Sequence, residues 1–226
     1  MKLYIGNKNY SSWSLRPWLL MRQSGIGFDE VRLRLDFDAG SAFRAALAGI
    51  TPTAKVPVLV DDDGFAVWDT LAITEYLAER FPDKQLWPAD RLSRARARSL
   101  CAEMHAGFGA LREHCPMNVE ASLPAVGARL LRELPAVGTD LARIVQMWQT
   151  ELERSGGPFL FAAFSAADAY FAPVASRIVT YALAVPPPVG AYVARVLELP
   201  AMAEWGADAR AEHDFLPFDE PYRERR

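Results

Sequence analysis

The sequence predicts an α/β domain followed by an all-α domain, and three observations lead to this fold class. Strand and helix patterns alternate from the first residues to about residue 82. A polar segment with prolines follows, and such segments commonly connect domains. From Arg91 onward the apolar residues recur at helical spacing. We therefore expect an α/β domain at residues 1–82, a linker at 83–90 and an all-α domain at 91–226.

The first domain contains a strand, a helix, a strand, a helix, two strands and a final helix. Val31, Leu33 and Leu35 alternate with charged residues, which is typical of a half-buried strand. The residues 61–64, Asp-Asp-Asp-Gly, form a hairpin turn signal between the last two strands. The predicted elements are strand 2–6, helix 15–23, strand 30–35, helix 41–48, strands 58–60 and 65–68, and a helix that begins at 69–70. A parallel βαβ unit followed by an antiparallel hairpin gives one mixed sheet, which is the arrangement of a thioredoxin-like domain.

The stretch from Thr51 to Leu77 brings a proline-bent loop and a helix N-terminus to the same end of this sheet. Pro57 stands directly before the strand at 58–60, where a proline cannot donate to the ladder, and X-Pro bonds are where cis peptides occur. Asp69 and Thr70 begin the next helix. An exposed helix N-terminus with a hydroxyl residue in its first turn suits a carboxylate ligand.

The second domain is predicted to consist of helices, at residues 91–114, 139–154, 166–183, 189–199 and 201–212. The segment from Ala166 to Leu183 is apolar nearly all round, so we expect it to be the buried central helix. Ser165 and Asp168 form the start signal of that helix, a capping box to which we assign a folding role. The tail from Phe215 to Arg226 is interrupted by prolines and is expected to pack loosely.

Composition limits the classes of partner and the cellular address. The chain has 226 residues, of which 51% are hydrophobic and 23% are charged, as in an ordinary globular protein. The formal net charge of -3 gives no reason to expect nucleic acid or an anionic membrane as partner. No apolar leader follows Met1, and the weakly charged region at 178–194 is interrupted by three prolines. We therefore expect a cytoplasmic protein without a membrane span.

Cysteine and glycine patterns exclude several kinds of site. Cys101 and Cys115 are not spaced as Cys-x-x-Cys, which argues against a thioredoxin-type redox pair and a disulfide framework. The sequence has no His/Cys/Asp cluster at metal-ligand spacing and no glycine-rich phosphate loop. We expect neither a metal nor a nucleotide.

In this order, the loop, Val56-Pro57, the turn, Asp69-Thr70 and the following Ala-Ile-x-x-Tyr-Leu helix resemble the glutathione transferase family. The resemblance covers nearly the whole chain and implies the glutathione transferase fold, a thioredoxin-like domain with a C-terminal helical bundle. It also implies that Val56, before a cis Pro57, pairs its backbone with the cysteinyl part of glutathione. Asp69 and Thr70 would hold the γ-glutamyl end. The alternative is a proline-bounded hairpin followed by a capped helix, which many α/β domains contain.

The catalytic residues are expected between the first strand and the first helix. The run Ser11-Ser12-Trp13-Ser14-Leu15-Arg16 resembles the Ser-Ser-Cys-Ser-x-Arg signature of the zeta and related serine-type classes. The resemblance makes Ser11 the catalytic serine, followed by Ser12, and Trp13 stands where the zeta class has cysteine. A helix N-terminus and a hydroxyl donor both favour a thiolate, so the pKa of a bound glutathione sulfur falls. The alternative is that the serines are only cap and turn residues.

Further candidates would hold the rest of the ligand. Lys55 is placed for the glycyl carboxylate as a point charge, and Asp69 suits the ammonium group. Thr70 and its N–H would hold the γ-glutamyl carboxylate at the helix start. Tyr10 and Trp13 flank the two serines and are expected to contact glutathione.

The pocket for the second substrate is expected across the domain cleft, along the predicted helix 91–114. The candidate wall residues are Tyr10, Trp13, His105, Phe108 and His114. His105 falls near the apolar face of its helix and is expected to be a packed core histidine.

The resemblance implies three functions that the sequence alone leaves open. The first is a glutathione transferase of detoxification, with glutathione as co-substrate, that activates the thiol for attack on a small hydrophobic electrophile. The second is a glutathione-dependent cis-trans isomerase similar to maleylacetoacetate isomerase. The third is a non-catalytic binding domain that has kept the fold. Members of the family are usually homodimers, and we carry this over as an expectation.

Overall fold

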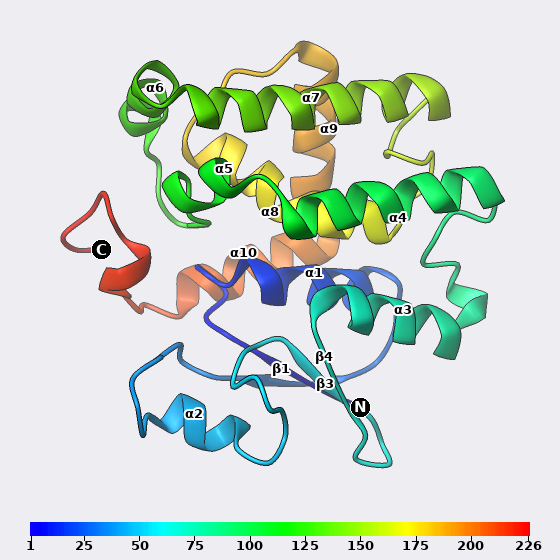
Figure 1. Cartoon of the computed structure of the whole chain (residues 1–226), viewed down its shortest axis with the longest axis vertical. Helices are drawn as coiled ribbons and strands as arrows, with labels where there is room; N and C mark the ends of the chain where they lie inside the picture. Colours follow the sequence, from blue (N-terminus) through cyan, green and yellow to red (C-terminus); the bar gives the residue numbers. More distant parts are fainter.

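The computed structural model describes residues 1–226 as a small sheet covered by helices, with a larger helical region stacked on one side. Figure 1 shows α1 and α3 between the sheet and that region, and α2 on the opposite face of the sheet. The first elements are β1 (Lys2–Ile5), α1 (Ser12–Gln23), β2 (Asp29–Arg32), α2 (Ala42–Leu47), β3 (Val58–Val60), β4 (Ala66–Trp68) and α3 (Thr70–Arg80). The remaining helices are α4 (Arg91–Ala106), α5 (Gly109–His114), α6 (Pro124–Glu133), α7 (Pro135–Ser155), α8 (Ala166–Thr180), α9 (Pro187–Leu197) and α10 (Pro200–Ala211).

The sheet has the mixed topology that the sequence predicts. Its strand order is β2-β1-β3-β4, with β1 parallel to β2 and antiparallel to β3, and with β3 antiparallel to β4. Successive side chains of a strand point to opposite faces. Leu3 and Leu59 accordingly join the main core under α1 and α3, whereas Val58 packs with Phe43 and Leu47 of α2. The thioredoxin-like fold of the N-terminal domain is therefore confirmed.

Helix α8 is the central element of the helical region, as its apolar sequence predicts. Every residue of α8 except Val179 is buried, and the helix packs against α1, α4 and α9. The predicted capping box at its start is present, because the Asp168 carboxylate accepts a hydrogen bond from the N–H of Ser165 at 2.9 Å. None of the helices combines the length and the apolar character needed to cross a bilayer.

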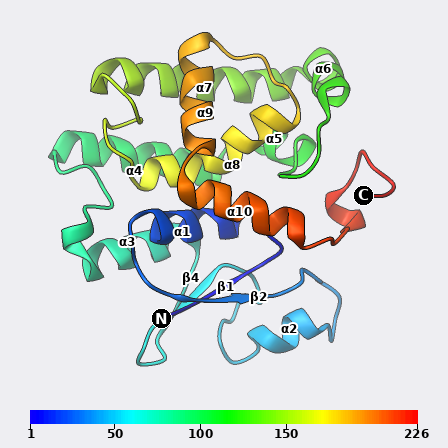
Figure 2. The same ribbon diagram turned by 180° about the vertical axis from the view of Figure 1, so that it is seen from behind.

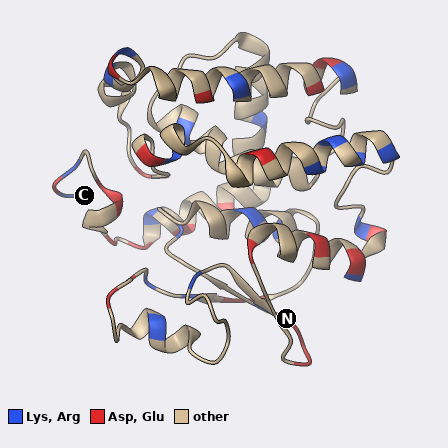
Figure 3. Ribbon diagram, in the orientation of Figure 1, with Lys and Arg blue, Asp and Glu red and all other residues tan.

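Charged side chains connect the outer helices to one another. Figure 3 shows both signs of charge along α3, α4 and α7. Arg98 of α4 pairs with Glu75 of α3, and Arg143 of α7 pairs with Glu103 of α4, each at 2.7 Å. These pairs are largely exposed, so each contributes little to stability, about 0 to 1 kcal/mol.

Helix α10 lies beside α1 (Figure 2) and also contacts the loop after β1 through side chains. The Lys8 ammonium is buried between the two parts and lies 2.6 Å from Asp208 of α10 and 2.8 Å from Glu30 of β2. The indole N–H of Trp205 donates to the Lys8 carbonyl at 2.9 Å. The loop that leads to the two candidate serines is therefore held from both sides.

The predicted helices differ most from the structure at three places. The single helix predicted at 91–114 is two helices, because Gly107 is a poor helix former and Phe108 adopts a positive φ of 58°. Helix α6 at 124–133 was not predicted. Helix α1 begins at Ser12 instead of Leu15, so Pro17 lies in its second turn and leaves the Trp13 carbonyl without its helical partner.

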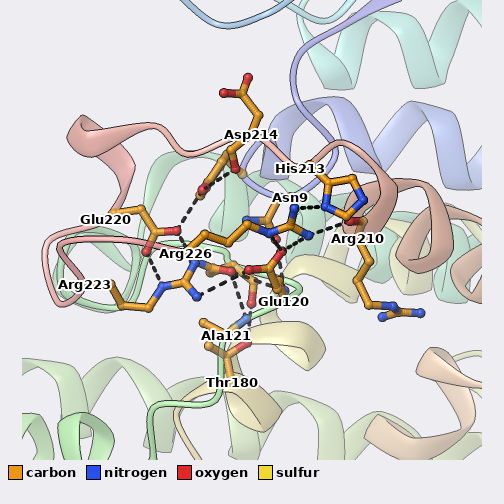
Figure 4. A network of polar contacts seen from close by, with 12 residues as sticks. Asn9, Glu120, Ala121, Thr180, Arg210, His213, Asp214, Glu220, Arg223 and Arg226 are labelled. Carbon is orange, nitrogen blue, oxygen red and sulfur yellow. Dashed lines mark hydrogen bonds and ion pairs between the residues drawn. The ribbon is translucent and has the colours of Figure 1, made fainter.

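The prediction for the C-terminal tail is also wrong, because the tail is anchored by polar contacts (Figure 4). Leu216 and Glu220 are buried, and the Glu220 carboxylate accepts hydrogen bonds from Tyr10 and Asn118 at 2.8 Å each and from Arg223. The tail carries the ion pair of Glu220 and Arg223 and buries the side chain of Leu216, so it is a packed segment and not a loose one.

Candidate functional site

Two adjoining cavities lie where the loops of the N-terminal domain face α4 and α5. Their volumes are about 640 and 560 Å³, and they share Trp13, Thr53, Lys55, Val56 and Arg112. The larger cavity also reaches the start of α1 and the tail, and the smaller one reaches the start of α3. Helix N-termini of two elements therefore open onto one connected space.

Both candidate serines line the larger cavity at the N-terminus of α1. Ser11 is the N-cap residue, but its hydroxyl caps no N–H; it donates to the hydroxyl of Ser14 at 2.8 Å. Ser14 also accepts from the N–H of Gly6 at 3.1 Å. The Ser12 hydroxyl makes no hydrogen bond within the chain, and Ser12 is half-buried. Each serine thus presents a hydroxyl at the positive end of a helix dipole.

The loop before β3 presents backbone groups and one cation to both cavities. The peptide bond between Val56 and Pro57 is cis. Neither the N–H nor the C=O of Val56 makes a hydrogen bond within the chain, so both are free to pair with an extended ligand. Lys55 is exposed and forms no ion pair. Val56, Pro57 and Lys55 all line the smaller cavity.

Directly after β4, Asp69 and Thr70 form the start of α3. Asp69 has a φ of 75° and caps the helix by accepting from the N–H of Leu71 at 2.8 Å. Its second carboxylate oxygen faces the cavity side chain of His105 at 3.3 Å. Thr70 is buried, and its own N–H makes no hydrogen bond within the chain. Its hydroxyl lies 2.5 Å from the hydroxyl of Tyr170 in α8.

The expectation that His105 is a packed core residue is wrong. Its side chain is 32% exposed and lines the smaller cavity between Asp69 and Tyr170. The physical reason is that α4 ends one residue later, so the last turn opens onto the cleft instead of the core. Two other expected wall residues, His114 and Phe108, line neither cavity.

Trp13 forms the wall between the two cavities and is covered by cations. The Arg16 guanidinium lies 4.1 Å from its ring centroid and that of Arg112 lies 4.9 Å away, both within cation–π range. Arg16 is buried without a carboxylate partner and donates to the carbonyls of Tyr170 and Ser12 at 3.0 and 3.3 Å. Burial lowers the pKa of Arg16 to about 9. The site is therefore positively charged near the start of α1.

Tyr10 contributes its ring to the larger cavity, but its hydroxyl is engaged by the tail. It donates to Glu220 at 2.8 Å. Burial, followed by this hydrogen bond to Glu220, raises the pKa of Tyr10 to about 12. The neighbouring Asp219 lines the same cavity, and burial raises its pKa to about 6.

The residues that sequence reasoning missed include Arg112, Arg177 and Asp219, which line the cavities, and Tyr170, which contacts Thr70 and His105. Arg177 is 4% exposed, donates through Nε to the carbonyl of Cys115 at 2.7 Å, and lines the larger cavity. Its buried NH1 group has no hydrogen-bond partner. Arg177 is the only cation in the mostly apolar segment 166–183, and this was the available signal. The other three residues carry no comparable local signal.

Comparisons with known proteins agree with this geometry. Residues 10–80 match the family described as glutathione S-transferase, N-terminal domain. Maleylacetoacetate isomerase of Pseudomonas aeruginosa is 34% identical over 102 residues, which are 45% of this chain and 47% of that protein. Glutathione S-transferase GstA of Escherichia coli O157:H7 is 32% identical over 136 residues, which are 57% of this chain and 65% of that protein. The chain spans about half the length of the first of these curated relatives and just under two-thirds of the second.

The likeness in three dimensions extends over most of the chain. A glutathione transferase homologue from Burkholderia, solved with bound glutathione, has a TM-score of 0.68 at 25% identity and covers 93% of this chain and 98% of its own. A maleylacetoacetate isomerase from Methylobacterium extorquens AM1, solved with bound malonate and glutathione, has a TM-score of 0.64 at 26% identity and covers 91% of this chain and 96% of its own.

Proposed function

We propose, from the premise that this chain belongs to the glutathione S-transferase family, that it binds glutathione and activates its thiol for attack on a small electrophile. One observation carries the proposal. The connected cavities are bordered by the N-termini of α1 and α3 and by the unpaired backbone of Val56 between them. An extended tripeptide with a thiol in its middle and a carboxylate at each end has a complementary group at every position.

Each part of glutathione has a proposed partner in this arrangement. The cysteinyl backbone would pair with the free N–H and C=O of Val56, next to Pro57. Lys55 would take the glycyl carboxylate as an exposed point charge. Thr70 would take the γ-glutamyl carboxylate through its free N–H, and Asp69 would take the ammonium group. Tyr10 and Trp13 would border the thiol.

The thiol would lose its proton to solvent and be held as a thiolate at the start of α1. The helix dipole and the cations Arg16 and Arg112 stabilise negative charge there. The Ser11 hydroxyl hydrogen, which now points at Ser14, rotates freely and would donate to the sulfur. The thiolate then forms a carbon–sulfur bond with the electrophile, and either a leaving group departs or the new carbanion takes a proton from solvent.

The test compares Ser11→Ala with Ser12→Ala in the thiolate absorbance of bound glutathione and in calorimetric titration. We expect Ser11→Ala to lose most of the thiolate and about tenfold to hundredfold in rate, because one charge-stabilising donor is removed. Its affinity for glutathione should change by less than about threefold. Ser12→Ala should keep the thiolate. The reverse pattern would assign the role to Ser12, and a wild type that binds no glutathione would leave the chain as a non-catalytic binding domain.

One observation favours isomerisation as the second candidate function. Arg177 lines the larger cavity and forms no ion pair, and its buried NH1 has no hydrogen-bond partner, so this arginine suits a carboxylate on the electrophile. Maleylacetoacetate, after which two of the relatives are named, is such an anion. An isomerase regenerates glutathione and a transferase consumes it, so the amount of free thiol remaining after turnover distinguishes the two reactions.

We also propose the cellular location, the role and the oligomeric state that are usual in this family. The chain would be a cytoplasmic detoxification enzyme for a small hydrophobic electrophile, and it would form a homodimer. Light scattering should then give twice the chain mass of 25.1 kDa. We also retain residues 83–90 as the proposed linker between domains at 1–82 and 91–226.

A further inference from the structure

Four polar side chains at the α3 end of the site form one continuous series of contacts. Asp69 lies 3.3 Å from Nε2 of His105, and Nδ1 of the same ring lies 2.8 Å from the Tyr170 hydroxyl. That hydroxyl lies 2.5 Å from Oγ1 of Thr70. Tyr170 and Thr70 are buried, at 1% and 2% exposure, whereas Asp69 and His105 face the cavity. The series thus ends at the hydroxyl beside the proposed γ-glutamyl site.

The Tyr170 hydroxyl has one hydrogen and can donate to only one of its two partners. Burial raises the pKa of Tyr170, so the hydroxyl keeps that hydrogen at neutral pH. When His105 is neutral, Asp69 favours a proton on Nε2, because the other tautomer would set a lone pair against the carboxylate. Nδ1 is then an acceptor and takes the Tyr170 hydrogen. The Thr70 hydroxyl must donate to the Tyr170 oxygen, which leaves Thr70 Oγ1 as an acceptor only.

A second proton on His105 reverses both hydrogen bonds of the Tyr170 hydroxyl and leaves the hydrogen bond from Nε2 to Asp69 unchanged. Nδ1–H now donates to the Tyr170 oxygen, and Tyr170 donates to Thr70. The Thr70 hydrogen is released and can point into the site. Only in this state can the Thr70 hydroxyl donate to a carboxylate.

We propose that Tyr170 is a positioning residue for glutathione, which couples the charge of His105 to the direction in which Thr70 donates. The inference rests on the proposed binding of the γ-glutamyl carboxylate at Thr70. It predicts that His105 takes up a proton when the ligand binds. Because histidine side chains change charge between about pH 5 and 8, binding should weaken as pH rises through this range.

Three cations lie around this series of contacts, in addition to the Asp69 carboxylate. Arg112 of α5 donates to the His105 carbonyl at 3.3 Å, and Arg16 of α1 lies 4.9 Å from the Tyr170 ring centroid. Lys55 lines the same cavity from the loop before β3. Arginine and lysine side chains stay charged from about pH 5 to 8, so these groups hold the field constant while His105 changes. An anionic ligand also attracts a proton to His105 directly, and the test must separate that effect from the relay.

The test is calorimetric titration with S-methylglutathione in buffers of different ionisation heat, which counts the protons taken up. The methyl group removes the thiol, whose ionisation would otherwise release a proton and hide the uptake. Wild type should take up about half a proton per bound ligand near neutral pH, and its affinity should fall by up to about tenfold between about pH 6 and 8. Tyr170→Phe keeps every charge and removes the relay. Its proton uptake should fall by more than about half, and its affinity for the ligand should vary by less than about threefold over the same pH range.

Tyr181→Phe is the matched control, because it also removes one buried tyrosine hydroxyl, which donates to the Pro116 carbonyl at 3.0 Å. It should keep the wild-type uptake and pH dependence. A second measurement follows His105 in the wild-type protein and does not depend on the Tyr170 variant. The chain has 3 histidines, so the ring resonance of His105 can be followed by NMR and assigned with His105→Gln. Its titration midpoint should rise by about one pH unit when the ligand saturates the site, as the tenfold coupling requires.

The possible outcomes separate the relay through Tyr170 from the proposed function. Wild-type binding without proton uptake, an unmoved His105 titration, or a Tyr170→Phe variant that behaves like wild type overturns the relay and leaves the proposed function standing. If wild type binds neither glutathione nor S-methylglutathione at any pH, the proposed function fails, and the relay fails with it.

Discussion

Asp168 is a carboxylate enclosed by the helical region, at 0% exposure. It accepts hydrogen bonds from the N–H groups of Leu160 and Ser165 and from the hydroxyl of Tyr192, at 3.1, 2.9 and 3.0 Å. Burial outweighs these donors and raises the pKa of Asp168 to about 6. The folded protein therefore binds a proton at this carboxyl more tightly than the unfolded chain does.

This shift fixes the sign of a pH effect on stability. The stabilisation from Asp168 is fully present below its unfolded pKa of about 4 and is lost as pH rises to about 6. The test compares the free energy of unfolding of wild type with that of Asp168→Asn, which does not titrate, by urea titration between about pH 4 and 7. The advantage of wild type should shrink by about 2 to 3 kcal/mol over this range. An advantage that grows with pH would mean that the hydrogen bonds to the carboxylate, and not its burial, dominate.

Contacts between residues close together in the sequence could be predicted, whereas contacts between distant residues could not. Ser165 and Asp168 are three residues apart, so sequence spacing alone identifies their capping box. Thr70 and Tyr170 meet across 100 residues, and no sequence pattern connects them. His105 was misjudged for the same reason, because its exposure depends on where α4 stops beside α3 and α8.

At the scale of elements, the contact between α6 and the end of α8 depends on one glycine. A Cβ at Gly127 would overlap the carbonyl oxygen of Tyr181, a backbone atom that cannot move aside. Gly127→Ala should therefore lower the free energy of unfolding by about 1 to 3 kcal/mol, measured by urea titration.

Gly138 in α7 is the matched control, since no atom lies within 4 Å of the position that an alanine methyl group would take there. Gly138→Ala should raise the free energy of unfolding by about 0.5 to 1 kcal/mol through helix propensity. Equal effects of the two substitutions would show that α6 moves to accommodate the methyl group.

Elements with strong local signals were predicted closely, and elements set by packing were not. The strand at Val58–Val60 has the predicted bounds, because a proline precedes it and a turn follows it. The break between α4 and α5 was not predicted, although Gly107 lies there. It is stabilised by a distant group, the Asp140 carboxylate, which accepts from the N–H of Leu111 at 2.9 Å.

At the scale of the whole molecule, the C-terminal tail contributes to a cavity whose other residues come from distant parts of the sequence. Tyr10 and Asn118 meet Glu220 at the edge of the larger cavity, and Asp219 lines that cavity. Arg226 pairs with Glu120 at 2.5 Å and also contacts His213 (Figure 4). Proline content indicated an irregular segment correctly, but contacts between residues far apart in the sequence determine that it packs.

Glu220 is the residue on which this anchoring depends. Burial acts to raise the pKa of Glu220, but hydrogen bonds from Arg223 and Tyr10 outweigh burial and hold the pKa below its usual value. A depressed carboxyl pKa means that the stabilisation is present at neutral pH and is lost as pH falls through the folded pKa. The tail should therefore be held most firmly at neutral pH and released in acid.

Glu220→Ala should release the tail at neutral pH, because it leaves the buried Asn118 amide without its acceptor and leaves Arg223 with only its longer ion pair to Glu120, at 3.5 Å. Trypsin should then cleave after Arg223 at least about tenfold faster, since proteolysis follows the population of the open segment. Glu224→Ala is the matched control, because it removes an exposed tail carboxylate that makes no contact in the chain. If Glu220→Ala is cleaved no faster than Glu224→Ala, the apolar contact of Leu216 holds the tail by itself. The Tyr10 hydroxyl would then be free to serve a bound ligand without opening the molecule.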